Sequence, residues 1–238
     1  MIFSKTLNAL RKTAPGKSVM VLKHGRSILR RSVATALIFL SPFAFGAGGG
    51  DPAAGKGLFP VCTACHGPTG QGNQAMNAPK LAGQESWYLI KQMQLFQTDA
   101  RGTAPGDMHG MQMGAMAKGP QLKAPGALEN LAAYIGTFED VPPANTVSGD
   151  AEKGKRLYMV CAACHGDKAQ GNEAMAGPRL AGQNDWYLVN QIKKFQKGQR
   201  GYHDSDHGGR QMRPMVATLT SDEAINDVVA YINTLVQN

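Results

Sequence analysis

The chain has 238 residues, of which 42% are hydrophobic, so it is long enough for one large domain or two small ones with packed cores. Its formal net charge of +8 comes entirely from residues 1–47, which hold eight Lys and Arg and no acidic residue, whereas the remainder holds 17 residues of each sign. A neutral body lacks the basic footprint of a nucleic-acid-binding protein, and that class of function is excluded.

Residues 1–47 have the pattern of a secretory signal peptide. A basic region precedes an apolar run over about 33–45, which is shorter than the roughly 20 residues that a membrane span requires. Small residues ending at Ala47 follow, as at a cleavage site. A start at Met20 would give a leader of more usual length. We therefore expect export to the periplasm, with an uncleaved membrane anchor, and hence membrane association, as the alternative.

The body of the chain is an internal duplication, which a shift of 99 residues brings into register. The shift superposes VCTACHGPTGQGN (61–73) on VCAACHGDKAQGN (160–172), and it repeats LAGQ at 81–84 and 180–183. Chance does not produce a match of this length, so each half is a copy of one domain. Further matched positions are Trp87-Tyr88 with Trp186-Tyr187, Phe96 with Phe195, and Arg101-Gly102 with Arg200-Gly201.

The segment EDVPPANTVSGD, about 139–150, has the composition of a linker between the copies. We therefore predict a leader over 1–47, one domain over 48–141 and a second over 142–238. A domain of about 90 residues buries little apolar surface by itself, which suggests that something else fills the middle of each.

Each copy shows three segments with helical spacing of apolar residues, and no segment alternates as a strand does, so we predict an all-α fold. Thr220 or Ser221, with Glu223, is a predicted capped helix start. The segments 63–84 and 99–124 are rich in Gly, Pro and Met and are predicted to be long loops that wrap a bound object. The expected helices span 51–62, 85–97 and 125–138 in the first copy, and 149–161, 184–196 and 220–235 in the second.

Both copies contain the motif C-x-x-C-H, for which zinc, a redox dithiol and haem compete. A zinc site that repeats with its domain should repeat its ligands, but His109 of the first copy matches Gly208 of the second. A redox dithiol needs no adjacent histidine and usually accompanies a βαβ pattern. Covalent haem attachment explains the whole motif and uses all four cysteines, which predicts two covalently bound haem c groups. The motif residues are Cys62, Cys65 and His66, and Cys161, Cys164 and His165.

Methionines that recur in register are candidates for the second axial ligand of each haem iron. Met76 lies only ten residues after His66, so we expect Met76 and its partner Met175 to stay on the histidine side of the porphyrin. Two later pairs lie far enough along the chain to cross to the opposite face. The residues alone leave both open: Met113 with Met212, and Met116 with Met215.

The two copies also contain the segments MQMGAM, RQMRPMVATLT, AAYI and VAYI. Together with the C-x-x-C-H and LAGQ segments, they resemble the diheme class I cytochromes c and most of all the cytochrome c4 family. The resemblance covers nearly all of 51–238 and implies two tandem class I cytochrome c domains, each wrapping one covalently bound haem. It also implies that Met113 and Met212 are the distal iron ligands, with Met116 and Met215 as runners-up.

The resemblance further implies roles for neighbouring residues. The carbonyls of Pro79 and Pro178 should accept a hydrogen bond from each ligating histidine, which fixes the ring tautomer. Trp87, Tyr88, Trp186 and Tyr187 are expected to wall the haem or the domain interface. Tyr134 and Tyr231 are expected to pack the last helix across the first, near Gly55 and Phe59 in one copy and Gly154 and Tyr158 in the other.

The expected function is single-electron transfer in a respiratory chain, because His/Met ligation closes both axial positions and leaves no seat for a substrate. The protein is thus predicted to be a carrier and not an enzyme. Its expected partners are membrane-bound or periplasmic redox proteins: a terminal oxidase or reductase, a quinol-oxidising complex or a dehydrogenase. A neutral body predicts docking through a small apolar or weakly charged patch near a haem edge.

Two alternatives remain open at this point. The chain could be the electron-accepting subunit of a periplasmic dehydrogenase complex. It could also be a diheme enzyme, such as a peroxidase or a thiosulfate-oxidising cytochrome, in which His109, His203 or His207 serves as an exchangeable ligand. We expect these three histidines to be solvated loop residues, with YHDSDHGG (202–209) as an exposed turn.

Overall fold

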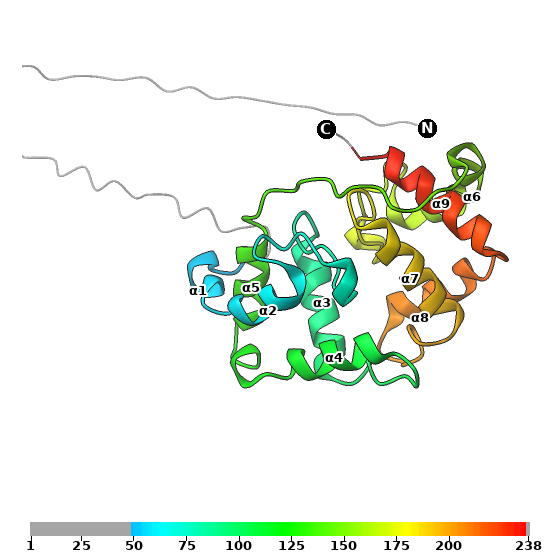
Figure 1. The fold of residues 1–238 in the computed structure, drawn as a ribbon. Coiled ribbons are helices and arrows are strands. Elements are labelled where there is room, and N and C mark those ends of the chain that lie inside the picture. The colour runs from blue at the N-terminus through cyan, green and yellow to red at the C-terminus, as the bar shows by residue number, and fades with distance from the viewer. Residues whose placement is uncertain (1–48, 237–238) are drawn as a thin grey trace, which may run out of the picture. The chain divides into compact units, whose positions relative to one another are not determined.

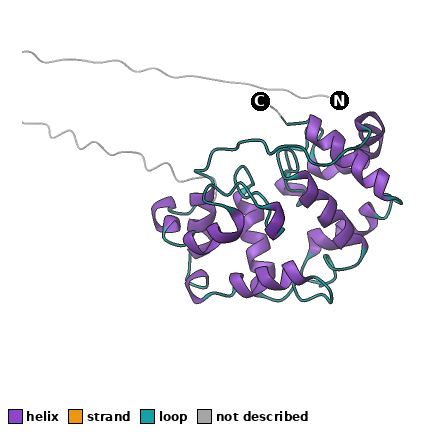
Figure 2. Cartoon of the chain, in the orientation of Figure 1, coloured by secondary structure: helices purple, strands orange, loops and turns teal. Residues whose placement is uncertain are grey.

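A computed structural model describes residues 49–236 of the chain, and within that range the secondary structure is helical apart from two isolated β-bridges (Figure 2). The predicted leader falls outside this range. None of the helices within it is long and apolar enough to cross a membrane. The first repeat contains α1 (Pro52–Lys56), α2 (Pro60–His66), η1 (Gln74–Met76), α3 (Ser86–Gln97), α4 (Met108–Ala117), η2 (Pro120–Leu122) and α5 (Ala127–Ile135). The second contains α6 (Ala151–His165), η3 (Glu173–Met175), α7 (Asp185–Gln196), α8 (His207–Val216) and α9 (Asp222–Thr234) (Figure 1).

The first and last helices of each repeat cross in close contact. A Cβ atom at Gly55 would overlap the carbonyl of Asn130 in α5, and one at Gly154 would overlap the carbonyl of Asp227 in α9. Glycine therefore lets the two backbones approach at the crossing. Aromatic rings extend it, as expected: Phe59 meets Tyr134 at 5.6 Å between centroids, and Tyr158 meets Tyr231 at 5.4 Å.

The predicted single helix over 51–62 is wrong, since the first repeat divides it into α1 and α2. Pro60 has no backbone N–H to donate to a preceding turn, so the chain breaks before it and starts a new helix there. The second repeat has Met159 at the same place, and α6 runs without a break from Ala151 to His165.

The predicted loop over 99–124 is also wrong, because α4 lies within it and α8 occupies the same place in the second repeat. Each helix starts at an aspartate whose carboxylate accepts an N–H bond: Asp107 from Gly110 at 3.0 Å, and Asp206 from Gly209 at 2.9 Å. Pro214 lies inside α8. The glycine, proline and methionine content suggested loops, although an aspartate that caps a helix stands at the start of each of these two segments.

The core of the second repeat gathers around α9, where Ile225, Val228 and Val229 are fully buried. The predicted capped start of this helix is confirmed at Ser221, whose hydroxyl accepts the N–H of Ala224 at 3.2 Å. In the first repeat α5 packs against Phe59 in the corresponding cluster. The helices thus form a frame around the C-x-x-C-H segments.

The two LAGQ turns join the repeats reciprocally. Gln84 donates to the carbonyl of Arg179 at 3.2 Å, and its counterpart Gln183 donates to the carbonyl of Lys80 at 3.0 Å. Lys80 and Arg179 both form ion pairs with Asp140 of the linker segment. The repeated tetrapeptide is therefore an interface element, with one linker carboxylate between its two cations.

Candidate haem centres

The cysteine and histidine of each motif line one cavity of about 620 Å³ that extends across both repeats. The first motif lies on α2 and the second at the end of α6, and none of the four cysteines is in a disulfide. Burial, with a smaller effect from the neighbouring thiol, raises the pKa of Cys62 and of Cys161 to about 11. Both are therefore neutral thiols at pH 7, directed into an apolar space.

The imidazoles of both motifs are buried and held by the expected hydrogen bond. His66 Nδ1 donates to the carbonyl oxygen of Pro79 at 2.8 Å, and His165 Nδ1 donates to that of Pro178 at 2.7 Å. This bond leaves Nε2 as the nitrogen available to a metal. Burial lowers the pKa of both histidines and outweighs the opposing effect of the hydrogen bond, which favours the neutral, metal-binding form.

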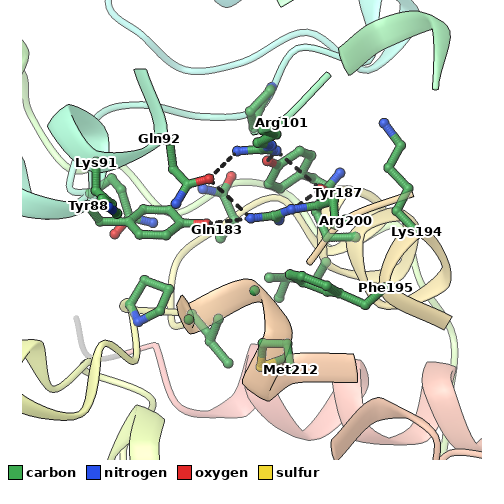
Figure 3. Close-up of a pocket in the computed structure, with 18 of the residues that line it drawn as sticks. Tyr88, Lys91, Gln92, Arg101, Gln183, Tyr187, Lys194, Phe195, Arg200 and Met212 are labelled. Carbon is green, nitrogen blue, oxygen red and sulfur yellow. Dashed lines mark hydrogen bonds between the residues drawn. The ribbon is translucent and has the colours of Figure 1, made fainter. Parts of the chain in front are cut away.

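The methionine pairs differ in their burial. Met113 on α4 and Met212 on α8 are partly buried and line the cavity, and Figure 3 shows Met212 below the inter-repeat side chains. Met116 and Met215 also reach the cavity, but they are 45% and 40% exposed and lie at its rim. The third pair, Met76 and Met175, is half exposed on the short turns η1 and η3.

The other three histidines within residues 49–236 are exposed, as expected, but two of them are helical. His109 and His207 stand in the first turns of α4 and α8, so the predicted exposed turn YHDSDHGG ends before Asp206, which is buried. His109 borders the cavity, while His203 bonds to Ser205 in the turn. Across residues 49–236 no three His, Cys, Asp or Glu side chains are grouped as a metal site.

Two buried arginines, 99 residues apart, connect the repeats around the cavity (Figure 3). Arg101 Nη1 donates to Gln92 at 2.6 Å and Arg200 Nη1 to Gln191 at 2.9 Å. Each also reaches the opposite repeat, and each guanidinium lies over the phenylalanine of its own repeat. The cross-repeat bonds are Arg101 to Tyr187 and Gln191, both 3.3 Å, and Arg200 to Tyr88 at 3.3 Å and Gln92 at 3.2 Å.

Sequence reasoning assigned no role to this pair, although Arg-Gly recurred in register. Two buried charges with amide and phenol partners create a strongly positive environment. Burial alone would raise the pKa of Tyr187, but the charges of Arg101 and Arg200 hold it below its ordinary value. The signal available in the sequence was the Arg-Gly pair that recurs in register at 101–102 and 200–201.

The residues present fit a haem. Three buried nitrogens that line the cavity have no hydrogen-bond partner among the described residues: Trp87 Nε1, Arg101 Nε and Arg200 Nε. A haem has two carboxylates, which are the acceptors that orphaned guanidinium donors require. Thiols, a neutral imidazole, a thioether and an apolar wall complete the donor set for a covalent haem c.

The comparisons with known proteins agree with this chemistry. The family model described as Cytochrome c matches twice, at residues 52–139 and 151–236. Cytochrome c4 of Azotobacter vinelandii is 32% identical over 87% of this chain and 100% of its own length. A thiosulfate dehydrogenase electron acceptor of Thiomonas intermedia is 30% identical over 74% of this chain and 77% of its own length.

A solved structure of a relative has a similar fold over most of the chain. The crystal structure of reduced recombinant cytochrome c4 from Pseudomonas stutzeri superposes with a TM-score of 0.59 at 30% identity, over 77% of this chain and 97% of that one. The predicted all-α duplication, with one C-x-x-C-H site in each half, is thereby confirmed. The chain belongs to the cytochrome c4 family of electron-transfer cytochromes, which carry two covalently bound haem c groups.

Proposed function

We propose a specific ligand set for the two haems. The four cysteines of the two motifs would hold the haems through thioether bonds, and the irons would be bound by His66 and Met113 in the first repeat and by His165 and Met212 in the second. The observation that supports it is that thiols, imidazole and this methionine of each repeat line the same cavity. When bound, each haem supplies a one-electron couple, and the protein holds its ligands without leaving an axial position for a substrate.

The protein's own residues then position and shield the haem. Pro79 and Pro178 fix the ring orientation of the ligating histidines, and the partly buried thioethers of Met113 and Met212 reach the cavity from α4 and α8. Arg101 and Arg200 offer their free Nε donors to haem carboxylates. Trp87, Tyr88 and Tyr187 add aromatic side chains to the lining of the cavity.

From this arrangement we infer an electron carrier of the periplasm that is not itself an enzyme. Exposed apolar side chains recur at equivalent rim positions of both repeats, Val61 with Val160 and Met116 with Met215. Such small apolar rims suit brief contacts with membrane-bound or periplasmic redox proteins, such as a quinol-oxidising complex and a terminal oxidase.

A second candidate role is supported by one of the relatives. The Thiomonas intermedia protein is called an electron acceptor of thiosulfate dehydrogenase, and this chain could accept electrons from a dehydrogenase of that class. Copurification of a dehydrogenase with the tagged holoprotein, followed by reduction of both haems by its substrate, favours this role over that of a general carrier.

The ligand set is tested by the near-infrared absorption of the ferric holoprotein, where methionine-to-iron charge transfer gives a band. Met113→Leu and Met212→Leu should each remove the band of one haem, about half the intensity. Met116→Leu and Met215→Leu are the matched controls and should retain it. Loss of the band in a control variant would transfer the assignment to that methionine, and a high-spin haem in the unmodified protein would contradict the role of carrier.

A further inference from the structure

A buried ion pair connects the second repeat to the helix that carries Met113 in the first. Lys194 Nζ on α7 lies 2.6 Å from Asp107 Oδ1, and the Asp107 carboxylate is only 2% exposed. The same carboxylate caps α4 through the N–H of Gly110. Lys194 also borders the cavity and stands beside the inter-repeat arginines in Figure 3. The second repeat thus fixes a cation at the start of the Met113 helix.

The equivalent position in the other direction has no lysine. Asp206 caps α8, the Met212 helix, as Asp107 caps α4. The residue that corresponds to Lys194 in the first repeat is Leu95, which is buried in that repeat. Asp206 is 3% exposed, and its Oδ2 has no hydrogen-bond partner within the described part of the chain. Asp107 therefore forms an ion pair in direct contact, whereas Asp206 forms none among residues 49–236 and meets the charge of Arg200 only at longer range.

This difference gives the two haem sites different electrostatic surroundings. Buried charges interact strongly because the interior screens them little. A positive charge near a redox centre favours its reduced form, since reduction lowers the positive charge on the iron. Arg101 and Arg200 recur at the 99-residue shift, and each bonds to the glutamine of its own repeat, so both repeats supply an arginine to the cavity. Lys194 has no such counterpart.

We propose that Lys194 of the second repeat tunes the haem of the first: its buried pair with Asp107, absent from the equivalent place around Asp206, raises the reduction potential of that haem. Lys194 is a positioning and tuning residue and does not itself bind iron. The step affected is the one-electron conversion of ferric to ferrous haem by an external donor, in which no covalent bond changes. This inference rests on the two-haem function proposed above.

The test is a spectrally monitored potentiometric titration of the holoprotein. Lys194→Leu, which introduces the residue of the equivalent position, should lower the equilibrium constant for reduction of one haem about tenfold, the order expected for a unit charge about 10 Å away at an effective dielectric constant of about 20. The other haem should change less than twofold. Lys194→Arg keeps the charge and should restore the original value. A Met212→His background, which displaces the second haem's potential, identifies the haem that moves.

Three carboxylate variants complete the experiment. Asp107→Asn retains a capping side chain and should raise the same equilibrium constant, and combining it with Lys194→Leu should bring the value back toward that of the original protein. Asp206→Asn should raise the constant of the other haem only. The proposal is overturned if Lys194→Leu lowers the melting temperature but moves neither potential, or moves both equally. Failure of Met212→His to displace any potential would instead refute the ligand set. The two failures are distinguishable, because a titration shows whether one potential or both have shifted even when it is not known which haem each potential belongs to.

Discussion

The two repeats follow the same chain path, yet they differ where the chain must join them. Equivalent positions hold the Cys–His segments, the proline carbonyls, the helix-crossing glycines and the interface arginines. Features found in one repeat alone sit at the joint: Asp140 pairs with both Lys80 and Arg179, and Asp185 holds the linker. Duplicated residues thus build the haem sites and much of the interface between the repeats, and residues present in one repeat alone add further contacts to that interface.

The first helix illustrates how far the repeats can diverge without moving the site. Pro60 divides it in the first repeat, while α6 is continuous in the second, but His66 and His165 end up in the same environment. The position of the C-x-x-C-H segment is therefore set by its contacts around the cavity and not by the helix that precedes it.

The largest expected effect comes from exchanging the residues at this position, Pro60 in the first repeat and Met159 in the second. Met159→Pro places proline inside α6, where it removes a backbone hydrogen bond and crowds the preceding turn, and should destabilise the second repeat by about 3 kcal/mol or more. Pro60→Met in the first repeat is the matched control and should change stability by about 1 kcal/mol or less, because this proline begins a helix. Chemical denaturation of the holoprotein measures both. If Met159→Pro destabilised the protein no more than Pro60→Met does, the second repeat would tolerate a broken helix as well as the first.

A slightly smaller effect is expected at a feature that the repeats share. Gly154→Ala places a methyl group against the Asp227 carbonyl and forces α6 and α9 apart, at a cost of about 2–3 kcal/mol. Gly55→Ala should cost about the same in the first repeat, since the crossing is equivalent. Gly57→Ala, which meets only one backbone atom at 3.7 Å, serves as control. A much cheaper Gly55→Ala would mean that the shorter α1 yields where α6 cannot.

The linker provides a third contrast, because its residues Thr146 and Val147 dock on Asp185 of the second repeat. Asp185 accepts bonds from the Thr146 hydroxyl at 2.7 Å and the Val147 N–H at 2.8 Å, whereas the corresponding residue is Ser86. Burial would raise the pKa of Asp185, but these bonds outweigh it and hold the pKa below its usual range. Asp185→Asn should cost about 2 kcal/mol at pH 7, and Ser86→Ala less than about 0.5 kcal/mol.

The pH dependence of the Asp185 effect has a definite sign. A carboxylate whose pKa is depressed by folding stabilises the native state above its unfolded pKa of about 3.9, and that stability is lost as the pH falls through the folded value. The stability gap between the original protein and Asp185→Asn should therefore narrow below about pH 4. A gap that stays constant down to pH 2 would show that the bonds do not depend on the charge of Asp185.

Much of this molecule is readable from the repeat. Each C-x-x-C-H motif, the Gly55 and Gly154 crossings and the Ser221 cap are local patterns or recur in register, and the duplication distinguishes functional residues from incidental ones. The helices α4 and α8 were missed because methionine, glycine and proline give no clear periodicity. Their aspartate caps are single residues whose significance depends on the burial that the fold creates.

The inter-repeat contacts could not be derived in the same way. Arg101 and Arg200 recur in register, but the tyrosine and glutamine that each one reaches in the opposite repeat are set by the docking of two domains. The ion pair between Lys194 and Asp107 is even harder to predict from the sequence, because the lysine does not recur in register: the equivalent residue of the first repeat is Leu95. A repeat reveals what is shared, and the structure is needed to interpret what is not.

The smallest expected effect concerns the N-terminal cap of the last helix, which differs between the two repeats. Ser221 caps α9, while α5 begins after Gly126, which has a φ of +77° and no capping side chain. Ser221→Ala should therefore cost the second repeat about 1 kcal/mol, whereas Gly126→Ala in the first should be destabilising through its left-handed backbone and not through a lost cap. Amide hydrogen exchange at Ala224 reports the cap directly. Unchanged protection there would show that packing of Ile225 and Val228 holds the first turn without the hydroxyl.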